Sequence, residues 1–186
     1  MSVTGTAGYS TRGLDGFSSI NKNPSFFYLE YYMANIKTVL RYGKNYIDVE
    51  MDDGSKLRRI EGTVAWRCRN RGNVKFGDFA KKYGAVGRDY IGHAVFPTVE
   101  MGDKARYSLL FDQTTRYYSL TLFRAISIYA PEDDGNDPNG YTKFLCKGAT
   151  YDKDTVLNTM TEEQRQYLLE RMALMEGYQV GRITQL

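Results

Sequence analysis

The sequence predicts an α+β fold, and three observations support that prediction. Residues 46–60 alternate between apolar and charged side chains in the way typical of a β-hairpin. Residues 161–177 carry the start and stop signals of a helix. Strand signals come first and helix signals later, an order that favours α+β over an alternating α/β fold. We expect an N-terminal β-hairpin, a mixed central segment and C-terminal helices, with a papain-like and a lysozyme-like topology both open.

The hairpin is the clearest local signal. Three apolar residues alternate with three acidic ones over residues 47–52, and an apolar pattern returns over residues 57–60. Between them, Asp53-Gly54 offers the positive φ angles that a tight turn requires. The hairpin leads directly to Trp66 and Cys68.

The other elements are predicted from caps, breakers and apolar runs. The aromatic residues 26–42 fit either a buried helix or a strand pair. Thr161 and Gln164 form a capping box, Gly177 follows the predicted helix, and Leu168, Met172 and Met175 share one face. Further predicted elements are a short helix over 76–84 closed by Gly84, a buried strand over 93–97, a helix over 98–111 capped by Thr98, a helix over 119–130, a polar turn after Pro131 and a short helix over 141–148.

Length and composition predict one globular domain. The chain has 186 residues, of which 42% are hydrophobic, enough for one sizeable core. Residues 1–25, rich in Gly, Ser, Thr and Asn, are expected to be a loose segment before a single catalytic domain over residues 26–186. An apolar run of about 18 residues is absent, so membrane insertion is not expected. The N-terminus lacks a basic start followed by an apolar core, so an ordinary signal peptide is not expected.

Charge and cysteine usage narrow the function classes. A net charge of +3, with 25 basic and 22 acidic residues interspersed, does not indicate nucleic acid as a partner. Weak attraction to an anionic polymer such as a cell wall is compatible with it. Two cysteines and one histidine nearly exclude the usual zinc sets, and neither a metal nor another cofactor is expected. A Cys68–Cys146 disulfide stays open for an oxidising compartment.

Cys68 and His93 are the leading catalytic candidates. A thiolate is a strong nucleophile, and a nearby imidazole can take its proton and later protonate the leaving amine. Arg67, Arg69 and Arg71 flank Cys68 and would favour its thiolate. Cys146, on an apolar helical pattern, is interpreted as a core residue.

Supporting residues are expected around this pair. Asp89 or Glu100 would orient His93 by accepting its second N–H, although either acid alone is more often a solvated surface group. Asn70 would join backbone N–H groups in holding an oxyanion, and Arg69 and Trp66 would contact substrate.

Two alternatives stay open. In a lysozyme-like glycan hydrolase or transglycosylase, Glu61 would protonate the glycosidic oxygen, though an exposed acid is the commoner role for such a glutamate. In a non-catalytic phage or secretion structural module, Cys68 would only pack in the core.

Three segments resemble phage virion-associated lytic proteins. The stretch "GTVAWRCRNRGNVKFGDFAKKYGAVGRD" followed by "HAVFPTVEMGDKA" is similar to their "WRNNNPGNI.YG.FA...GAIG.D..FAIFP..E.G..A". Further on, "AISIYAPEDDGNDPNGYTKFL" resembles "I..YAPP.END...YI", and "MEGYQVGRIT" resembles "EGW..G.I". Together with the preceding hairpin, the resemblance covers residues 46–184.

The departures from that pattern coincide with the two leading candidates. Cys68 stands at the first Asn of the phage motif, and His93 stands near the Arg or Gly before "FAIF". Small Cys–His proteins of this kind resemble the peptidoglycan amidase effectors of type VI secretion, specifically their second family. That resemblance implies cysteine-dependent cleavage of stem-peptide or cross-link amide bonds in peptidoglycan. It also implies synthesis in the bacterial cytoplasm, export to the periplasm of a target cell and a cognate immunity protein.

Overall fold

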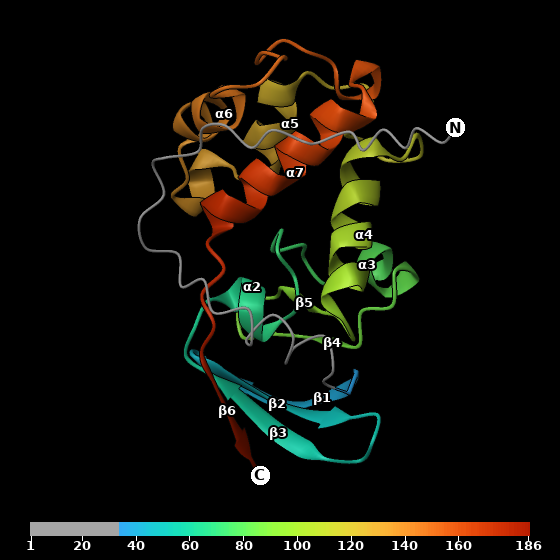
Figure 1. Cartoon of the computed structure of the whole chain (residues 1–186), viewed down its shortest axis with the longest axis vertical. Helices are drawn as coiled ribbons and strands as arrows, with labels where there is room; N and C mark the ends of the chain where they lie inside the picture. The colour runs from blue at the N-terminus through green and yellow to red at the C-terminus, as the bar shows by residue number, and fades with distance from the viewer. Residues whose placement is uncertain (1–33) are drawn as a thin grey trace, which may run out of the picture. The chain divides into compact units, whose positions relative to one another are not determined.

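A four-stranded antiparallel sheet opens the described part of the chain, residues 34–186 of the computed structural model. The loose segment predicted for residues 1–25 and the first part of the aromatic segment 26–42 lie outside the described residues. Strands β1 (Ile36–Gly43), β2 (Tyr46–Met51), β3 (Lys56–Ile60) and β6 (Arg182–Gln185) pair in the order β1-β2-β3-β6 (Figure 1). Strand β6, near the C-terminus, therefore pairs into a sheet whose other strands come from residues 36–60.

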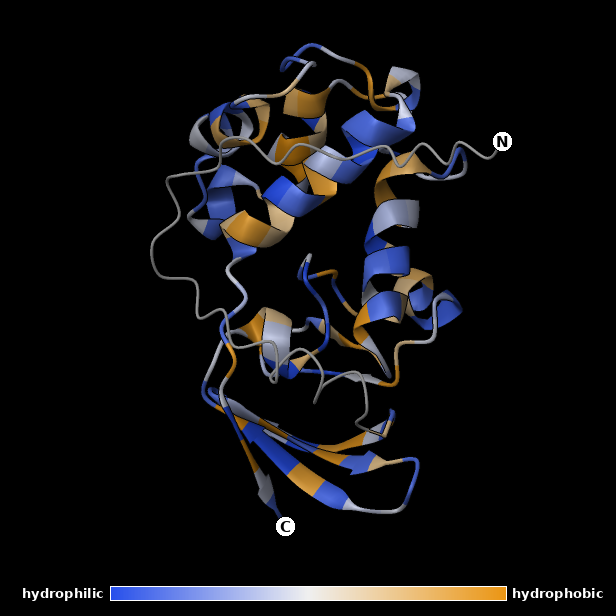
Figure 2. Cartoon of the chain, viewed as in Figure 1, coloured by the Kyte–Doolittle hydropathy of each residue, from blue (hydrophilic) through white to orange (hydrophobic). Residues whose placement is uncertain are grey.

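The predicted hairpin is confirmed as β2 and β3. Val49 pairs with Leu57, and Gly54 adopts φ +85° in the turn between them, whereas Asp53 does not adopt the positive φ that was also expected. Ile47, Val49 and Met51 point into the core, and Figure 2 shows the alternating hydropathy along these strands.

The opposite face of β2 holds one buried acid. Asp48 is 1% exposed and lies between two arginines, at 2.7 Å from Arg58 and 2.9 Å from Arg41. Hydrogen bonds from Arg58 are the main cause that lowers the pKa of Asp48, against the opposing effect of burial. This ion pair ladder ties β1, β2 and β3 together across their polar face.

Short elements follow the sheet in the middle of the chain. They are α2 (Val64–Arg67), α3 (Asp78–Lys82), β4 (Gly87–Arg88) and β5 (Ala94–Val95). The helix predicted over residues 76–84 and the buried strand predicted over 93–97 are both present in shorter form, and Gly84 follows the helix at φ +86°. β4 and β5 form a separate two-stranded sheet, with Arg88 opposite Ala94.

Helices make up the C-terminal half, as expected. They are α4 (Val99–Phe111), α5 (Leu122–Tyr129), α6 (Pro138–Cys146) and α7 (Glu162–Glu176), with single turns η1 (Glu132–Asp134) and η2 (Leu157–Thr159). Thr98 caps α4 through a 3.2 Å bond from the Met101 N–H, and Thr161 forms the predicted capping box of α7.

Further differences from prediction concern α6 and α7. α6 begins at Pro138 rather than residue 141, because Asp137 caps it and proline is well suited to a first helical position. The predicted apolar face of α7 holds for Leu168 and Met172, which are buried, but Met175 is 45% exposed. Met175 instead lies beside a surface pocket described below.

The described part of the chain buries its apolar side chains in three groups. One lies among α4–α7, one lies between the sheet and the segment that follows it, and a smaller one surrounds α3 and β5. Gly102 lets α4 approach the Arg69 carbonyl, because a side chain at this position would clash with that oxygen. In residues 34–186, the helices are all too short or too polar to cross a bilayer.

Candidate functional site

The loop from Cys68 to Asn73, called the 68–73 loop below, holds the expected nucleophile Cys68 and two of the expected oxyanion and substrate-binding residues, Arg69 and Asn70. It follows the single turn of α2, which Thr63 caps. Arg69 and Asn73 adopt left-handed backbone angles, φ +51° and +49°. These two positions turn the chain sharply, so the loop presents successive side chains to different parts of the molecule.

Cys68 lies in the hydrophobic core, not at a surface. Its exposed fraction is 0%, and it packs with apolar side chains of the sheet and with Val95. Burial and then the charge of Asp89 raise the pKa of the thiol well above its ordinary range. Within residues 34–186 the sulfur accepts and donates no hydrogen bond. In this conformation the expected thiolate is therefore disfavoured.

The arginines that flank Cys68 are engaged elsewhere. Arg67 donates to the carbonyls of Glu61 and Gly62, both at 2.8 Å. Arg69 donates to the Pro97 carbonyl, and Arg71 forms an ion pair with Asp103. Arg67 favours the Cys68 thiolate to a minor degree, but burial outweighs this effect.

His93 and Asp89 do come together, as one of the two expected arrangements. The imidazole Nδ1 lies 3.4 Å from Asp89 Oδ2, and the backbone N–H of His93 donates to Asp89 Oδ1 at 2.7 Å. Burial opposes ionisation of Asp89, but the hydrogen bonds from His93 and Ile91 outweigh it and lower the pKa of this carboxyl. Asp89 thus both orients His93 and holds the turn between β4 and β5.

Both ring nitrogens of His93 are occupied. Lys75 Nζ lies 3.2 Å from Nε2, and an ammonium group can only donate, so Nε2 accepts and the proton resides on Nδ1 facing Asp89. No hydrogen bond joins His93 to Cys68 in the described part of the chain. Glu100, the other expected orienting acid, is exposed in the first turn of α4.

The expected oxyanion and substrate-binding residues are also inside the fold. Asn70 is fully buried; its Nδ2 donates to the carbonyls of Val74 (2.9 Å) and Ala94 (2.8 Å), and its Oδ1 accepts from the Val74 N–H at 3.0 Å. Trp66 is 0% exposed beneath the guanidinium of Arg59, 4.2 Å from the ring centre. Asn70 therefore holds the loop and β5 together and has no N–H left for an oxyanion.

The far end of the 68–73 loop meets the helices instead. Asn73 Nδ2 donates to Glu176 Oε2 at 2.6 Å, across 103 residues of sequence. The Tyr129 hydroxyl donates to the Gly72 carbonyl. Arg106 donates to the carbonyls of Leu169 at 3.0 Å and Arg71 at 3.3 Å. The loop is thus fixed to α4, α5 and α7.

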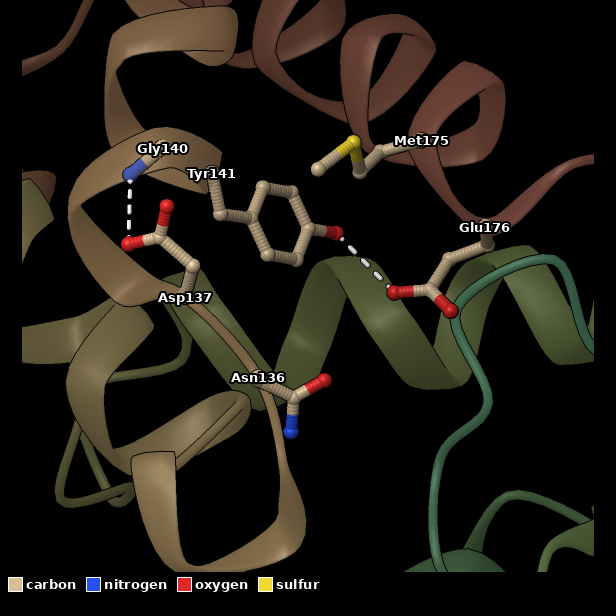
Figure 3. A pocket seen from close by; sticks show the side chains of 6 residues that line it. All are labelled: Asn136, Asp137, Gly140, Tyr141, Met175 and Glu176. Carbon is tan, nitrogen blue, oxygen red and sulfur yellow. Dashed lines mark hydrogen bonds between the residues drawn. The ribbon is translucent and has the colours of Figure 1, made fainter.

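A surface pocket of about 230 Å³ opens beside Glu176, and we call it the Glu176 pocket (Figure 3). Its walls come from the α6 N-terminus and the end of α7. The lining residues are Asn136, Asp137, Gly140, Tyr141, Met175 and Glu176. Figure 3 shows the ring of Tyr141 between the two carboxyl groups of the pocket.

Glu176 is held at both oxygens. Tyr141 Oη donates to Oε1 at 3.0 Å, while Asn73 donates to Oε2. Burial and then the charge of Glu176 raise the pKa of Tyr141, so its hydroxyl stays a donor at neutral pH. Two donors from different elements thus engage both oxygens of this carboxyl group. Within residues 34–186, Glu176 forms no ion pair with a basic side chain.

Asp137 is the second carboxyl of the Glu176 pocket. Its Oδ1 accepts the Gly140 N–H at 2.9 Å as the cap of α6. Its Oδ2 makes no hydrogen bond to any described residue. One pocket therefore combines a carboxylate held by two donors with a carboxyl that has an unused oxygen.

Glu61, the carboxyl expected for glycan cleavage, lies in a different setting. Its two oxygens accept from Arg182 at 2.7 and 2.9 Å, and its side chain is 51% exposed. The hydrogen bond from Arg182 is the main cause that lowers the pKa of Glu61. Both oxygens of Glu61 are therefore engaged by Arg182.

Sequence reasoning did not single out Glu176, Asp137 or Tyr141. All three lie in the segments that carry the resemblance to phage lytic proteins, which was the one available signal. Both cysteines are free thiols, so the disulfide left open above is not formed here. Across residues 34–186, the His, Cys, Asp and Glu side chains nowhere gather in a group of three that could hold a metal ion.

Comparison with known proteins does not identify a relative. The chain matches no protein-family model, and a search of curated proteins finds no significant match.

Proposed function

We propose that this chain degrades peptidoglycan by cleaving its glycan strand in the Glu176 pocket. One observation carries the proposal. The three segments that resemble phage virion-associated lytic proteins contribute to the same place, with Asn73 from the first, Tyr141 from the second and Glu176 from the third. These three residues lie far apart in sequence, and each belongs to a segment that resembles the same family. Their contact at one carboxylate supports a shared site there.

The departures from the phage pattern leave this pocket intact. Cys68 packs toward the sheet and His93 bonds to Asp89, whereas the pocket is built by α6, α7 and Asn73. A change at Cys68 or His93 therefore removes none of the contacts to Glu176. For this reason we favour glycan cleavage over the cysteine chemistry expected from the sequence.

Glycoside cleavage requires a proton donor and a group that stabilises positive charge at the anomeric carbon. In our proposal, Asp137 Oδ2 delivers a proton to the glycosidic oxygen, and the C1–O bond breaks with its electron pair on that oxygen. The Glu176 carboxylate stabilises the resulting charge at C1 until water adds there and reprotonates Asp137. Hydrogen bonds from Tyr141 and Asn73 fix the orientation of Glu176 for this role.

The test is mass spectrometry of the muropeptides that the full chain releases from purified sacculi. Glu176→Gln is expected to lower the release by about 100- to 10,000-fold. The matched control is Glu170→Gln, an exposed glutamate on the same helix, which is expected to leave the release unchanged. Products cut between sugars with intact stem peptides support the proposal; unchanged release by Glu176→Gln would overturn it.

Cysteine amidase activity is the second candidate, and one observation favours it. Asp89 contacts His93 as a catalytic acid would contact its base, although Cys68 would have to leave the core to join them. In that case the same experiment gives cleaved stem peptides, and Cys68→Ala abolishes them. Export by type VI secretion, action in a target-cell periplasm and a cognate immunity protein remain predictions from the resemblance.

A further inference from the structure

Asn73 has an unusual backbone conformation, and its side chain makes one hydrogen bond, to Glu176. Its φ of +49° lies in the left-handed region, which Asn tolerates better than most side chains but which still opposes folding. The same side chain donates to Glu176 Oε2 at 2.6 Å. Its Oδ1 is buried and has no hydrogen-bond partner among residues 34–186. Asn73 thus combines a strained backbone and an unpaired side-chain oxygen with a single hydrogen bond to the proposed catalytic carboxylate.

The backbone around Asn73 leaves it little freedom. A side chain added at Gly72 would clash with the Arg106 side chain and approach the Tyr129 hydroxyl to 2.8 Å. The Asn73 N–H donates to the Asn70 carbonyl at 3.0 Å, and Asn70 is itself fixed by three hydrogen bonds. The amide of Asn73 is therefore presented to Glu176 by a rigid loop.

Glu176 takes its two donors from different elements. Asn73 reaches it from the 68–73 loop, and Tyr141 reaches it from α6. The titratable groups that face it are Tyr141 and Tyr129, whose pKa values its charge helps to raise, and Asp137 across the pocket. The charge of Arg106 acts on both tyrosines and partly offsets the rise in their pKa values.

We infer that Asn73 is a positioning residue that fixes the orientation of the Glu176 carboxyl group for glycan cleavage. This inference rests on the proposed function of the Glu176 pocket. Asn73 does not line the pocket and need not touch substrate. It acts by removing the rotational freedom of one carboxylate oxygen, and a small displacement of a catalytic group is enough to slow a reaction strongly.

Two variants of Asn73 separate this role from a structural one. Asn73→Gly keeps the left-handed backbone but removes the donor, so we expect kcat on solubilised glycan strands to fall about 10- to 100-fold with little change in KM. Asn73→Asp keeps the shape but places a carboxylate against Glu176, and the two must then share a proton. The acidic limb of its rate profile is expected to move upward by about one pH unit or more.

The control is Asn45→Gly, an exposed asparagine in the turn between β1 and β2, which should match the wild type in both assays. If Glu176→Gln is inactive while both Asn73 variants keep the wild-type rate and pH profile, the inference fails and the proposed function stands. If Glu176→Gln is fully active, the proposed function fails first. The positioning role is also overturned by a third outcome. In that outcome, the activity of Asn73→Gly falls only in proportion to the amount of folded protein, and the pH–rate profile of Asn73→Asp matches that of the wild type.

Discussion

The two ends of the 68–73 loop meet opposite environments. Cys68 is enclosed by apolar side chains of the sheet and Val95, and burial suppresses its ionisation. Asn73 points to the helices and contacts a carboxylate beside an open pocket. Only four residues lie between the buried Cys68 thiol and Asn73, the residue that we propose to support catalysis.

This contrast teaches that reactivity follows side-chain direction more closely than sequence neighbourhood. Three arginines surround Cys68 in sequence, yet the folded chain directs them to backbone carbonyls and to Asp103. The left-handed angles at Arg69 and Asn73 separate the two ends of the loop. Electrostatic activation of a cysteine needs charge in space, and none of these side chains outweighs the effect of burial.

The largest expected effect concerns thiol access. Cys146 is only partly buried, whereas Cys68 requires local opening of the core before a reagent can reach it. We expect iodoacetamide to label Cys68 about 1,000-fold more slowly than Cys146 in the native protein, and both at similar rates in guanidinium chloride. Mass spectrometry of tryptic peptides over time measures both rates in one sample. Faster labelling of native Cys68 than of Cys146 would restore the cysteine amidase as the leading candidate.

Asn70, between the two ends, should be critical for stability. Asn70→Ala removes three buried hydrogen bonds. The Val74 N–H loses its bond to Asn70 Oδ1, and the carbonyls of Val74 and Ala94 lose their bonds from Asn70 Nδ2. We expect the free energy of unfolding to fall by about 3 kcal/mol, measured by denaturant titration. Asn45→Ala, at an exposed turn, serves as the control and should change little. A loss of activity in Asn70→Ala without a loss of stability would instead indicate an oxyanion role.

Local signals explain which parts of the fold could be predicted. The hairpin turn at Asp53-Gly54 and the caps at Thr98 and Thr161 act within a few residues, so their effects are visible in sequence. Strand β6 was not predicted, because it is exposed along its length and pairs with β3 only through long-range contacts. The α+β class was predicted correctly because it depends on the order of elements alone.

The candidate site could be predicted only in part, for the same reason. Asp89 and His93 lie four residues apart, and their contact was one of two expected arrangements. The partners of Glu176 lie 35 and 103 residues away in sequence, at Tyr141 and Asn73. No periodicity or spacing reports such a contact, and burial of Cys68 depends on strands that pack over it from elsewhere in the chain.

A smaller effect is expected from pH, through the contribution of the sheet that covers Cys68 to the free energy of unfolding. The folded pKa of Asp48 lies below its ordinary value of 3.8, so its contribution to stability is present above that pH and is lost as the pH falls through the lower folded value. Asp48→Asn should lower the free energy of unfolding at pH 7 by about 1.5 kcal/mol and flatten its decline below about pH 4. Urea titrations of both proteins from pH 7 to pH 2.5 measure this. Parallel pH curves for the two proteins would exclude Asp48 as the source.

The smallest effect is expected at Glu61, the carboxyl that sequence reasoning offered for glycan cleavage. Its ion pair with Arg182 is largely solvated, and exposed pairs of this kind contribute little to stability. Glu61→Gln retains the shape and one acceptor oxygen, so the free energy of unfolding should change little. Muropeptide release should stay close to that of the wild type, because Glu61 lies outside the Glu176 pocket and both of its oxygens are engaged by Arg182. The informative measurement is release by Glu61→Gln beside Glu176→Gln on the same sacculi. The opposite result would be a strong loss of activity in Glu61→Gln together with full activity in Glu176→Gln. In that case the acid that cleaves the glycan is Glu61, at the end of β3, and the Glu176 pocket has another function.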